Sequence, residues 1–328
     1  MSMLLLLLAF GVLFFVAWNV GANNTANIMG IPVGSGVLSL RGAVMIVLVL
    51  EILGVVFYGG NVARTVGTDM IGTYGMRLVE AIAVMALVGG FVTLASFFRV
   101  PMSSTQVLVG CVVGYALATS SILNWGTVFG IALSWVISPF IGILFGFVGY
   151  YAVRRYFLSD ALNMDEVRMI FGVFVALEVA SAAMLAFAQG ANSIAAIVGV
   201  FSGVVPLLSS GALLVMKVVG GVGVGAGMAM WGYRVIRTIS SRIVAMDPAM
   251  CFVSQISAAI IVLLFTFFGM PVSSVHVVVG TVIGVGLISG ARMIHWNVIY
   301  EIAGSWVFVV PLSAFVSFAF IRALIVFV

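Results

Sequence analysis

The stretch Gly21-Ala22-Asn23-Asn24-Thr25-Ala26-Asn27 returns later in the chain as Gly190-Ala191-Asn192-Ser193-Ile194-Ala195-Ala196. A second phrase, Pro101-Met102-Ser103-Ser104-Thr105-Gln106, returns as Pro271-Val272-Ser273-Ser274-Val275-His276. The two copies are 169 residues apart in the first case and 170 in the second. A near-constant offset indicates that one half of the chain duplicates the other. Because the surrounding sequence is nearly all apolar, we expect these four segments to be unwound or to start helices, and to face one another around one site inside a membrane.

The composition excludes a soluble globular protein. Of the 328 residues, 64% are hydrophobic and 7% are charged, and the mean hydropathy is +1.35. Apolar stretches of about 18 residues or more, long enough to cross a bilayer as helices, recur from end to end. The formal net charge of +4 comes from basic residues between these stretches, which is a topology signal and not the basic face of a nucleic-acid-binding protein. The lipid bilayer is therefore an expected partner, and nucleic acid is not.

Ten main apolar stretches predict an all-α integral membrane protein. They lie at 3–20, 41–60, 79–98, 104–119, 126–152, 168–188, 209–231, 250–268, 273–290 and 297–326. Two shorter stretches, 25–38 and 194–208, are expected to be re-entrant pieces or extra half-spans, which gives ten to twelve spans. Five spans per half is an odd number, so the second repeat (168–328) should be inverted relative to the first (1–152), with a cytoplasmic linker at 153–167.

The arginines between the spans predict the orientation of the chain. With the N-terminus outside, only Arg64 and Arg77 lie in external loops. The cytoplasmic loops then carry Arg41, Arg99, Arg154, Arg155, Arg168, Arg234, Arg237, Arg242 and Arg292. The positive-inside rule favours this arrangement in a plasma or inner membrane, with both termini external. The segment 1–8 lacks a basic flank, so we expect a first span there and not a cleaved signal peptide.

The two Pro–Ser phrases are typical of helix N-termini. Proline is favoured in the first turn of a helix, and Ser or Thr caps the free amides there. Such a terminus is a site for anions, and two termini related by inverted symmetry would point at one shared anion. The alternative is that each Ser-Ser pair only caps a helix at the water interface.

The Gly–Ala–Asn phrases predict interrupted helices that line a cavity. Asn23, Asn24 and Asn27 are costly in a lipid-facing helix, and Gly and Asn tolerate unusual backbone angles. Side-chain and freed backbone carbonyl oxygens suit a hard cation, and unwound backbone inside a membrane occurs only where it is buried in protein or lines a cavity. The alternative is an Asn-rich loop on the surface.

Few ionisable residues fall inside the predicted spans, and they are Glu51, Glu178, Lys217 and Glu301. Such residues need a partner or water, so each is a candidate functional residue. Glu51 is expected to carry a proton or to hold a cation, with a structural ion pair, for instance to Lys217, as the alternative; Glu178 and Glu301 face the same two choices. His276 is a candidate donor to an anion, whereas His295 is expected at the membrane interface.

No motif in the chain indicates an enzyme. The glycine-rich run at 220–227 looks like a dinucleotide fingerprint but lacks the strand–helix–strand context that such a motif needs. Cys111 and Cys251 lie in apolar runs, where packing is a better account of a cysteine than a disulfide or a metal site. Neither a nucleophile with its base nor an ATP-binding module is visible, so pumping would draw on an ion gradient or on a partner. No cofactor is expected, and sodium is the only metal ion expected.

Nearly the whole chain resembles the PiT family of inorganic phosphate transporters. The segment 21–27 looks like the family's GAND-x-AN signature, and 271–276 is similar to its PVSTTH motif. The segments 33–41, 51–54, 60–66 and 231–238 follow its pattern as well. The resemblance implies duplicated, inverted halves and the import of phosphate, commonly with sodium and in some members with protons.

The chain departs from the family pattern at charged or titratable positions. The motif Asp is Asn24 in the first copy and Ser193 in the second, the His of the first copy is Gln106, and a Glu in the span before the second PVSTTH motif is Gln255. Fewer carboxylates bind cations more weakly and repel a dianion less. These departures leave the coupling ion open and make sulfate a credible alternative to phosphate.

We therefore expect a secondary active transporter that imports inorganic phosphate by alternating access, coupled to sodium, with the proton as the alternative. Expected anion ligands are Ser103, Ser104, Thr105, Gln106, Ser273, Ser274, Val275, His276, Asn24 and Asn192. Expected cation ligands are Asn23, Asn24, Asn27, Gln189, Asn192, Ser193 and Glu51. The alternatives are a permease for sulfate or a related oxyanion, a passive anion channel, and a membrane receptor. The sequence does not report the oligomeric state, and a homodimer is one arrangement that it leaves open.

Overall fold

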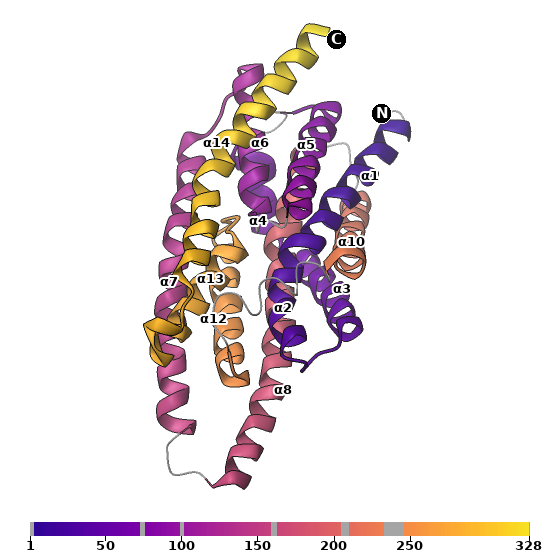
Figure 1. Ribbon diagram of the computed structural model, residues 1–328. Coiled ribbons are helices and arrows are strands. Elements are labelled where there is room, and N and C mark those ends of the chain that lie inside the picture. Colours follow the sequence, from indigo (N-terminus) through magenta and orange to yellow (C-terminus); the bar gives the residue numbers. More distant parts are fainter. Residues whose placement is uncertain are drawn as a thin grey trace.

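The computed structural model describes residues 3–72, 76–98, 102–158, 163–204, 210–232 and 246–327, which form an elongated bundle of helices without a strand (Figure 1). The η elements named here are π-helical turns, except η5, which is a 3₁₀ turn. The first half contains α1 (Met3–Val20), η1 (Gly21–Thr25), α2 (Ala26–Gly34), α3 (Leu40–Phe57), α4 (Gly60–Arg64), η2 (Thr65–Asp69), α5 (Leu78–Phe97), α6 (Ser104–Thr119) and α7 (Trp125–Phe157).

The second half repeats much of this order of elements. It contains α8 (Met164–Gln189), η3 (Gly190–Ile194), α9 (Ala195–Val204), α10 (Ser210–Gly227), η4 (Met228–Gly232), α12 (Pro248–Phe267), α13 (Ser274–Ser289), η5 (Ala291–Met293) and α14 (Trp296–Phe327). At the offset of the duplicated phrases, α8, η3 and α9 are equivalent to α1, η1 and α2. By the same offset, α13 and α14 are equivalent to α6 and α7.

Each of the ten apolar stretches that the sequence predicts as a span forms a helix. Among the described residues, eight helices are long and apolar enough to cross a membrane, and α6 and α13 are shorter apolar helices. The predicted all-α membrane fold is therefore confirmed. The short stretches 25–38 and 194–208 do not start new helices from loops, because α2 and α9 continue α1 and α8 through the π-helical turns.

The polar segment 153–167 is mostly helical. α7 continues through Arg154 and Arg155 to Phe157, and α8 begins at Met164. Asn163 and Glu166 form a capping box, in which the Asn163 side chain accepts from the Glu166 amide at 2.9 Å. The break in the helices is therefore shorter than the predicted linker, and its residues 159–162 lie outside the described part of the chain.

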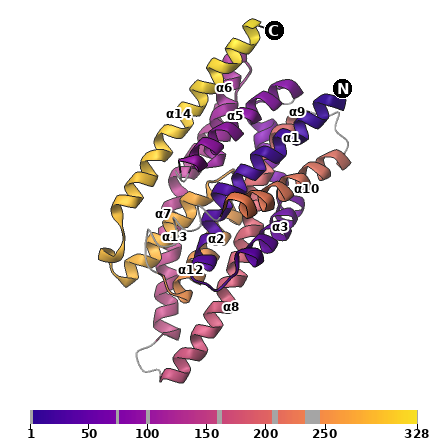
Figure 2. The same cartoon turned by 45° about the vertical axis from the view of Figure 1, so that its right-hand side comes forward.

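The two halves interlock through glycines at equivalent positions. A Cβ atom placed on Gly110 of α6 would lie 2.8 Å from the carbonyl oxygen of Val310 on α14. Its counterpart on Gly280 of α13 would lie 2.3 Å from the carbonyl oxygen of Pro139 on α7. Small residues allow such close backbone contact between membrane helices. Each Pro–Ser helix thus packs against the long helix of the opposite half, so that α14 runs beside α6 (Figure 2).

The first turn of α1 and the last turn of α14 lie at the same end of the bundle (Figure 1). From that end α1 runs toward the opposite end, whereas the equivalent α8 runs back toward the chain termini. The side of the membrane that each end faces stays a prediction. Four of the arginines used for it, Arg99, Arg234, Arg237 and Arg242, lie outside the described residues.

Candidate functional site

The two Pro–Ser phrases start helices, as predicted. Ser103 and Ser273 are the N-cap residues of α6 and α13, with extended backbones. The Ser103 hydroxyl accepts from the Gln106 amide at 3.3 Å, and the Ser273 hydroxyl accepts from the His276 amide at 3.4 Å. Both serines are 2% exposed, so these helix starts are enclosed by protein and do not cap a helix at an open water interface. The first proline of the pair, Pro101, lies outside the described residues.

The two Gly–Ala–Asn phrases are helical, whereas the sequence predicts unwound backbone there. Gly190, for example, has φ −59° and ψ −45°, ordinary values for a right-handed helix. Each phrase forms a π-helical turn, η1 or η3, and such turns are frequent at functional sites. A Cβ on Gly21 would lie 2.0 Å from the Val224 carbonyl oxygen, and one on Gly190 would lie 2.1 Å from that of Glu51. The glycines therefore serve close contact between helices and not chain reversal.

Asparagines of the two π-helical turns make the same hydrogen bond in each half. The Asn23 side-chain amide donates to the Ser96 hydroxyl at 3.2 Å, and the Asn192 amide donates to the Thr266 hydroxyl at 2.8 Å. Asn192 also donates to the Met270 carbonyl oxygen at 3.0 Å, which leaves its own carbonyl oxygen facing away from these partners. The side chain of Asn27, the third predicted asparagine ligand of the first phrase, lies outside the described residues.

One hydrogen bond joins the two phrases in the first half and has no equivalent in the second. Asn24 donates to the Ser104 hydroxyl at 2.7 Å. The equivalent residues are Ser193 and Ser274, whose hydroxyls are buried and have no hydrogen-bond partner among the described residues. Because serine is shorter than asparagine, Ser193 does not replace that bond. The second half therefore has two open hydroxyls where the first half has a closed pair.

The N-termini of α6 and α13 meet at Trp306 of α14. The Gln106 side-chain amide donates to the Trp306 carbonyl oxygen at 3.5 Å, and the His276 ring stacks on the Trp306 ring with centroids 3.6 Å apart. His276 Nδ1 lies 3.2 Å from the Trp135 carbonyl oxygen, while Trp135 Nε1 donates to the Pro271 carbonyl oxygen at 2.9 Å. The two helix starts that the sequence predicts to converge are thus brought together. Neither tryptophan is among the predicted site residues, although Ser134-Trp135 and Ser305-Trp306 are a duplicated pair that signals both.

The bond to Trp135 determines which His276 nitrogen is free to bind a ligand. A backbone carbonyl oxygen only accepts, so Nδ1 carries the hydrogen and, in the neutral ring, Nε2 is a hydrogen-bond acceptor. His276 is buried, and its Nε2 has no partner among the described residues. In its neutral form this side chain therefore accepts from a ligand at Nε2, whereas its place in the Pro–Ser phrase predicts a donor.

Several other buried polar atoms around the two phrases have no hydrogen-bond partner within the described chain. The acceptors are Asn24 Oδ1, Asn192 Oδ1, Gln106 Oε1 and Gln189 Oε1, and the donors are Trp306 Nε1 and Gln189 Nε2. An orphaned buried polar atom costs about 1–3 kcal/mol, so such a group is rare unless a ligand, an ion or water satisfies it. Their concentration here indicates a binding site for something polar.

Glu51 lies between the two π-helical turns. Its carboxylate accepts from the Thr25 hydroxyl of η1 at 2.9 Å, and its backbone is the one that approaches Gly190 of η3. Glu51 is fully buried, and its second carboxylate oxygen has no hydrogen-bond partner in the described residues. Within that part of the chain it forms no ion pair with Lys217, so the structural ion pair is wrong for this pair of residues.

The remaining predicted site residues add few open polar atoms to this region. The Thr105 hydroxyl is 3.0 Å from that of Ser103, within the same helix cap. The Val275 side chain packs in an apolar cluster, so only its backbone amide is available to an anion. His295 is exposed, in keeping with an interfacial position, and the Glu301 side chain lies outside the described residues. No group of three or more His, Cys, Asp or Glu is placed to hold a metal ion in the described chain.

Known proteins resemble this chain over almost its whole length. A putative phosphate permease of Chlamydia pneumoniae is 29% identical over 95% of this chain and 96% of its own. The chloroplastic inorganic phosphate transporter 2-1 of Arabidopsis thaliana is 28% identical over 92% of this chain and 69% of its own. A solved structure described as the sodium-dependent phosphate transporter superposes with a TM-score of 0.88, at 25% identity, over 99% of this chain and 100% of that one. The model of the phosphate transporter family matches residues 20–317, and the chain therefore belongs to the phosphate transporter family.

Proposed function

We propose that this chain is a secondary active transporter that imports inorganic phosphate, driven by a sodium gradient, with the proton as the alternative coupling ion. Family membership supports phosphate as the substrate, and the structural neighbour's description as sodium-dependent favours sodium. The observation that carries the proposal is the set of buried, unpartnered polar atoms where the N-termini of α6 and α13 meet.

The phosphate would bind between these two helix starts. Free backbone amides at a helix N-terminus, together with its positive dipole end, favour an anion. The open Ser274 hydroxyl and the Trp306 indole N–H add donors from the second half. In the first half the Ser104 hydroxyl already accepts from Asn24, which leaves its own hydrogen available to the anion.

The acceptors in the same place favour phosphate over sulfate. Phosphate carries at least one O–H at neutral pH, whereas sulfate offers acceptor oxygens alone. His276 Nε2 and Gln106 Oε1 are both open acceptors, and a protonated phosphate oxygen supplies a donor to one of them, which sulfate does not. A site built to accept from a substrate hydroxyl discriminates strongly against the analogue that lacks it.

The coupling cation would lie against the π-helical turns. Carbonyl oxygens of Asn24, Gln189 and Asn192, with the open oxygen of Glu51, are a set of hard ligands of the kind that sodium prefers. Three neutral oxygens and one carboxylate fit a monovalent cation better than a divalent one, because the charge is low. This cation would in turn offset the negative charge of the anion beside it.

Alternating access would use the crossed packing of the halves. α1 and α8 run in opposite directions, which supports inverted repeats at 1–152 and 168–328. Because α6 packs on α14 and α13 on α7, the two phosphate-binding helix starts belong to units that contain parts of both halves. Rocking of these units would expose the site first to one side and then to the other.

Uptake of radiolabelled phosphate into proteoliposomes, with sodium and pH gradients imposed separately, tests the proposal. We expect saturable uptake that follows the sodium gradient and is competed weakly by sulfate. Ser274→Ala should lower uptake at least about fivefold, the value of one hydrogen bond of about 1 kcal/mol. Ser289→Ala, at the far end of α13 where the hydroxyl lies against the Met250 sulfur and the Tyr150 side chain, is the control and should match wild type.

His276→Phe tests the preference for phosphate. The ring still stacks on Trp306 but the acceptor is lost, so the ratio of sulfate to phosphate inhibition constants should fall about tenfold or more.

Absence of uptake under either gradient would refute transport coupling. Currents without saturation would favour a passive channel, and sulfate competing as well as phosphate would favour the sulfate permease.

A further inference from the structure

A second membrane-embedded carboxyl group, Glu178 of α8, lies away from the anion site and has no role in the transport proposed above. It is 0% exposed. One of its oxygens accepts from the Ser35 hydroxyl at 3.2 Å, and the other has no hydrogen-bond partner among the described residues. A buried carboxylate without a cationic partner is costly inside a membrane protein, so this group needs a cation or a proton.

The residues around Glu178 supply no cation. The start of α12 contributes Asp247, its N-cap residue, and the thiol of Cys251, which interacts with the Glu178 carboxyl group; neither is positively charged. α2 carries no titratable residue, and α3 carries Arg41 and Glu51. Neither the arginine nor any other base is ion-paired with Glu178 in the described part of the chain. Among the described residues, the Ser35 hydroxyl is the one oxygen that is hydrogen-bonded to the Glu178 carboxyl group. The site therefore has too few oxygen ligands for sodium, but it suits a proton.

Glu178 holds one end of a short helix whose other end is held by Glu51. Thr25, directly before α2, donates to Glu51, and Ser35, directly after α2, donates to Glu178. The two carboxyl groups belong to α3 and α8, so α2 is tied to one helix of each half. Ser35 is exposed, which places the buried carboxyl group one side chain away from water.

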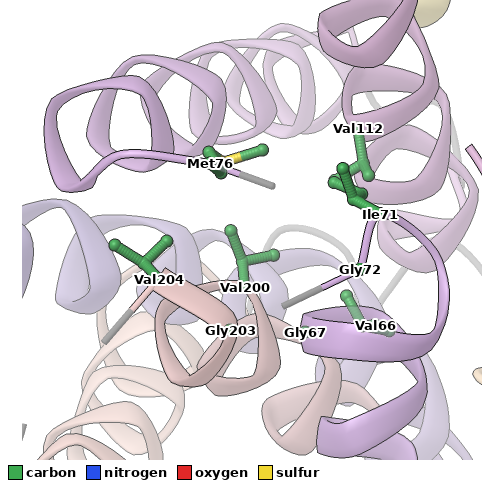
Figure 3. Close-up of a pocket in the computed structure, with 9 residues that line it drawn as sticks. All are labelled: Val66, Gly67, Ile71, Gly72, Met76, Val112, Val200, Gly203 and Val204. Atoms are coloured by element: carbon green, nitrogen blue, oxygen red, sulfur yellow. The ribbon is translucent and has the colours of Figure 1, made fainter. Parts of the chain in front are cut away.

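The equivalent place in the other half carries no such pair. At the offset of 169 residues, Glu178 corresponds to Ala9 and Ser35 to Val204. The end of α9 instead borders a pocket lined only by Val, Ile, Met and Gly, including Val200 and Gly203 (Figure 3). The hydrogen bond between Ser35 and Glu178, which a proton can weaken, is therefore present at the end of α2, whereas the equivalent end of α9 has apolar packing.

We propose that Glu178 is a proton-binding site that controls the release of the α2 end, and this inference rests on the proposed transport function. When ionised, Glu178 is a strong acceptor and retains Ser35. When it takes a proton from a hydronium ion on the side of the α2–α3 loop, it becomes a weaker acceptor, the bond to Ser35 weakens, and water is the other product. The proton returns to water on the same side when the end closes again.

Phosphate efflux from vesicles tests this with the pH changed only on the side of the α2–α3 loop. Phosphate starts on the opposite side at constant pH, so its own titration is unchanged. We expect the wild-type rate to change at least about threefold between pH 5 and pH 8, because the carboxyl group exchanges its proton with water on that side only. Glu178→Gln should flatten this dependence to under about 1.5-fold. Glu80→Gln is the control, because Glu80, in the first turn of α5, pairs with the preceding Arg77, and it should keep the wild-type profile.

Infrared difference spectra at two pH values give a second readout that does not depend on transport. The wild type should show the carbonyl stretch of a protonated carboxylic acid, Glu178→Gln should lose that band, and Ser35→Ala should show it at a higher midpoint pH because a donor to the ionised form is gone. An unchanged pH profile and an unchanged band in Glu178→Gln would overturn the inference. If wild type transports no phosphate but Glu178→Gln still loses the band, the proposed function fails and the proton site stands.

Discussion

Gly190→Ala is expected to separate α3 from η3 and to abolish most transport. The new Cβ would lie 2.1 Å from the Glu51 carbonyl oxygen and 2.5 Å from its Cα, both backbone atoms that cannot rotate away. Restoring an ordinary contact of 3.4 Å requires the two backbones to move apart by about 1.3 Å. That displacement falls on the turn that carries Asn192, and misplacement by about 1 Å is enough to lower a rate about 100-fold.

The stability change should separate this effect from helix propensity. Alanine favours a helix over glycine by about 0.5–1 kcal/mol, whereas overpacking costs about 1–3 kcal/mol, so Gly190→Ala should lower the thermal midpoint in detergent. Gly172→Ala is the matched control on α8, the helix that leads into η3, since its Cβ would meet nothing within 4 Å. It should leave uptake unchanged and hold or raise the midpoint.

Phosphate uptake and thermal unfolding of both variants, at matched amounts of inserted protein, check the reasoning. Wild-type uptake by Gly190→Ala would show that α3 and η3 separate without disturbing the site, and would refute the role given to this contact. An equal loss in Gly172→Ala would attribute the effect to the loss of glycine flexibility and not to the clash.

Three further outcomes follow from single contacts. Ser193→Asn should recreate in the second half the bond that Ser104 receives in the first; because the Ser274 hydrogen would stay available to the anion, as that of Ser104 does, phosphate binding should change by less than about twofold in a scintillation assay, and a larger loss would contradict this. Trp135→Phe should lower the free energy of unfolding by about 1–3 kcal/mol, because the buried Pro271 carbonyl oxygen loses the donor that Trp135 supplies. Trp306→Phe removes no hydrogen bond within the described residues, so equal thermal midpoints of the two variants would contradict this. Tyr115→Phe should lower the midpoint through loss of a 2.6 Å bond to the acid at the start of α5, with uptake unchanged.

Local signals in the sequence predict the helix starts well. The caps at Ser103 and Ser273 depend on a hydroxyl and an amide three residues on, so both partners lie within one phrase. The constant offset of the duplication likewise predicts which elements are equivalent. The same information places the polar residues of both phrases in a single buried region.

Contacts between distant segments account for what the sequence does not predict. Gly21 and Gly190 predict an unwound backbone, but the backbone there is helical. The two glycines are needed instead for close contact, of Gly21 with α10 and of Gly190 with α3. The stacking of His276 on Trp306 requires α13 and α14 to come together at these two residues, which no spacing in the sequence reveals. The acceptor state of the His276 ring follows from the carbonyl oxygen of Trp135, 141 residues away along the chain.

The crossed glycine contacts also constrain how the protein is made. α6 is synthesised well before α14, yet Gly110 and Gly114 of α6 make their close backbone contacts with α14. Until α14 leaves the ribosome, these two glycines lack their native contacts in the bilayer. The first repeat therefore reaches its native packing only after α14 has inserted, and a chain that stops before α14 would leave Gly110 and Gly114 without these contacts.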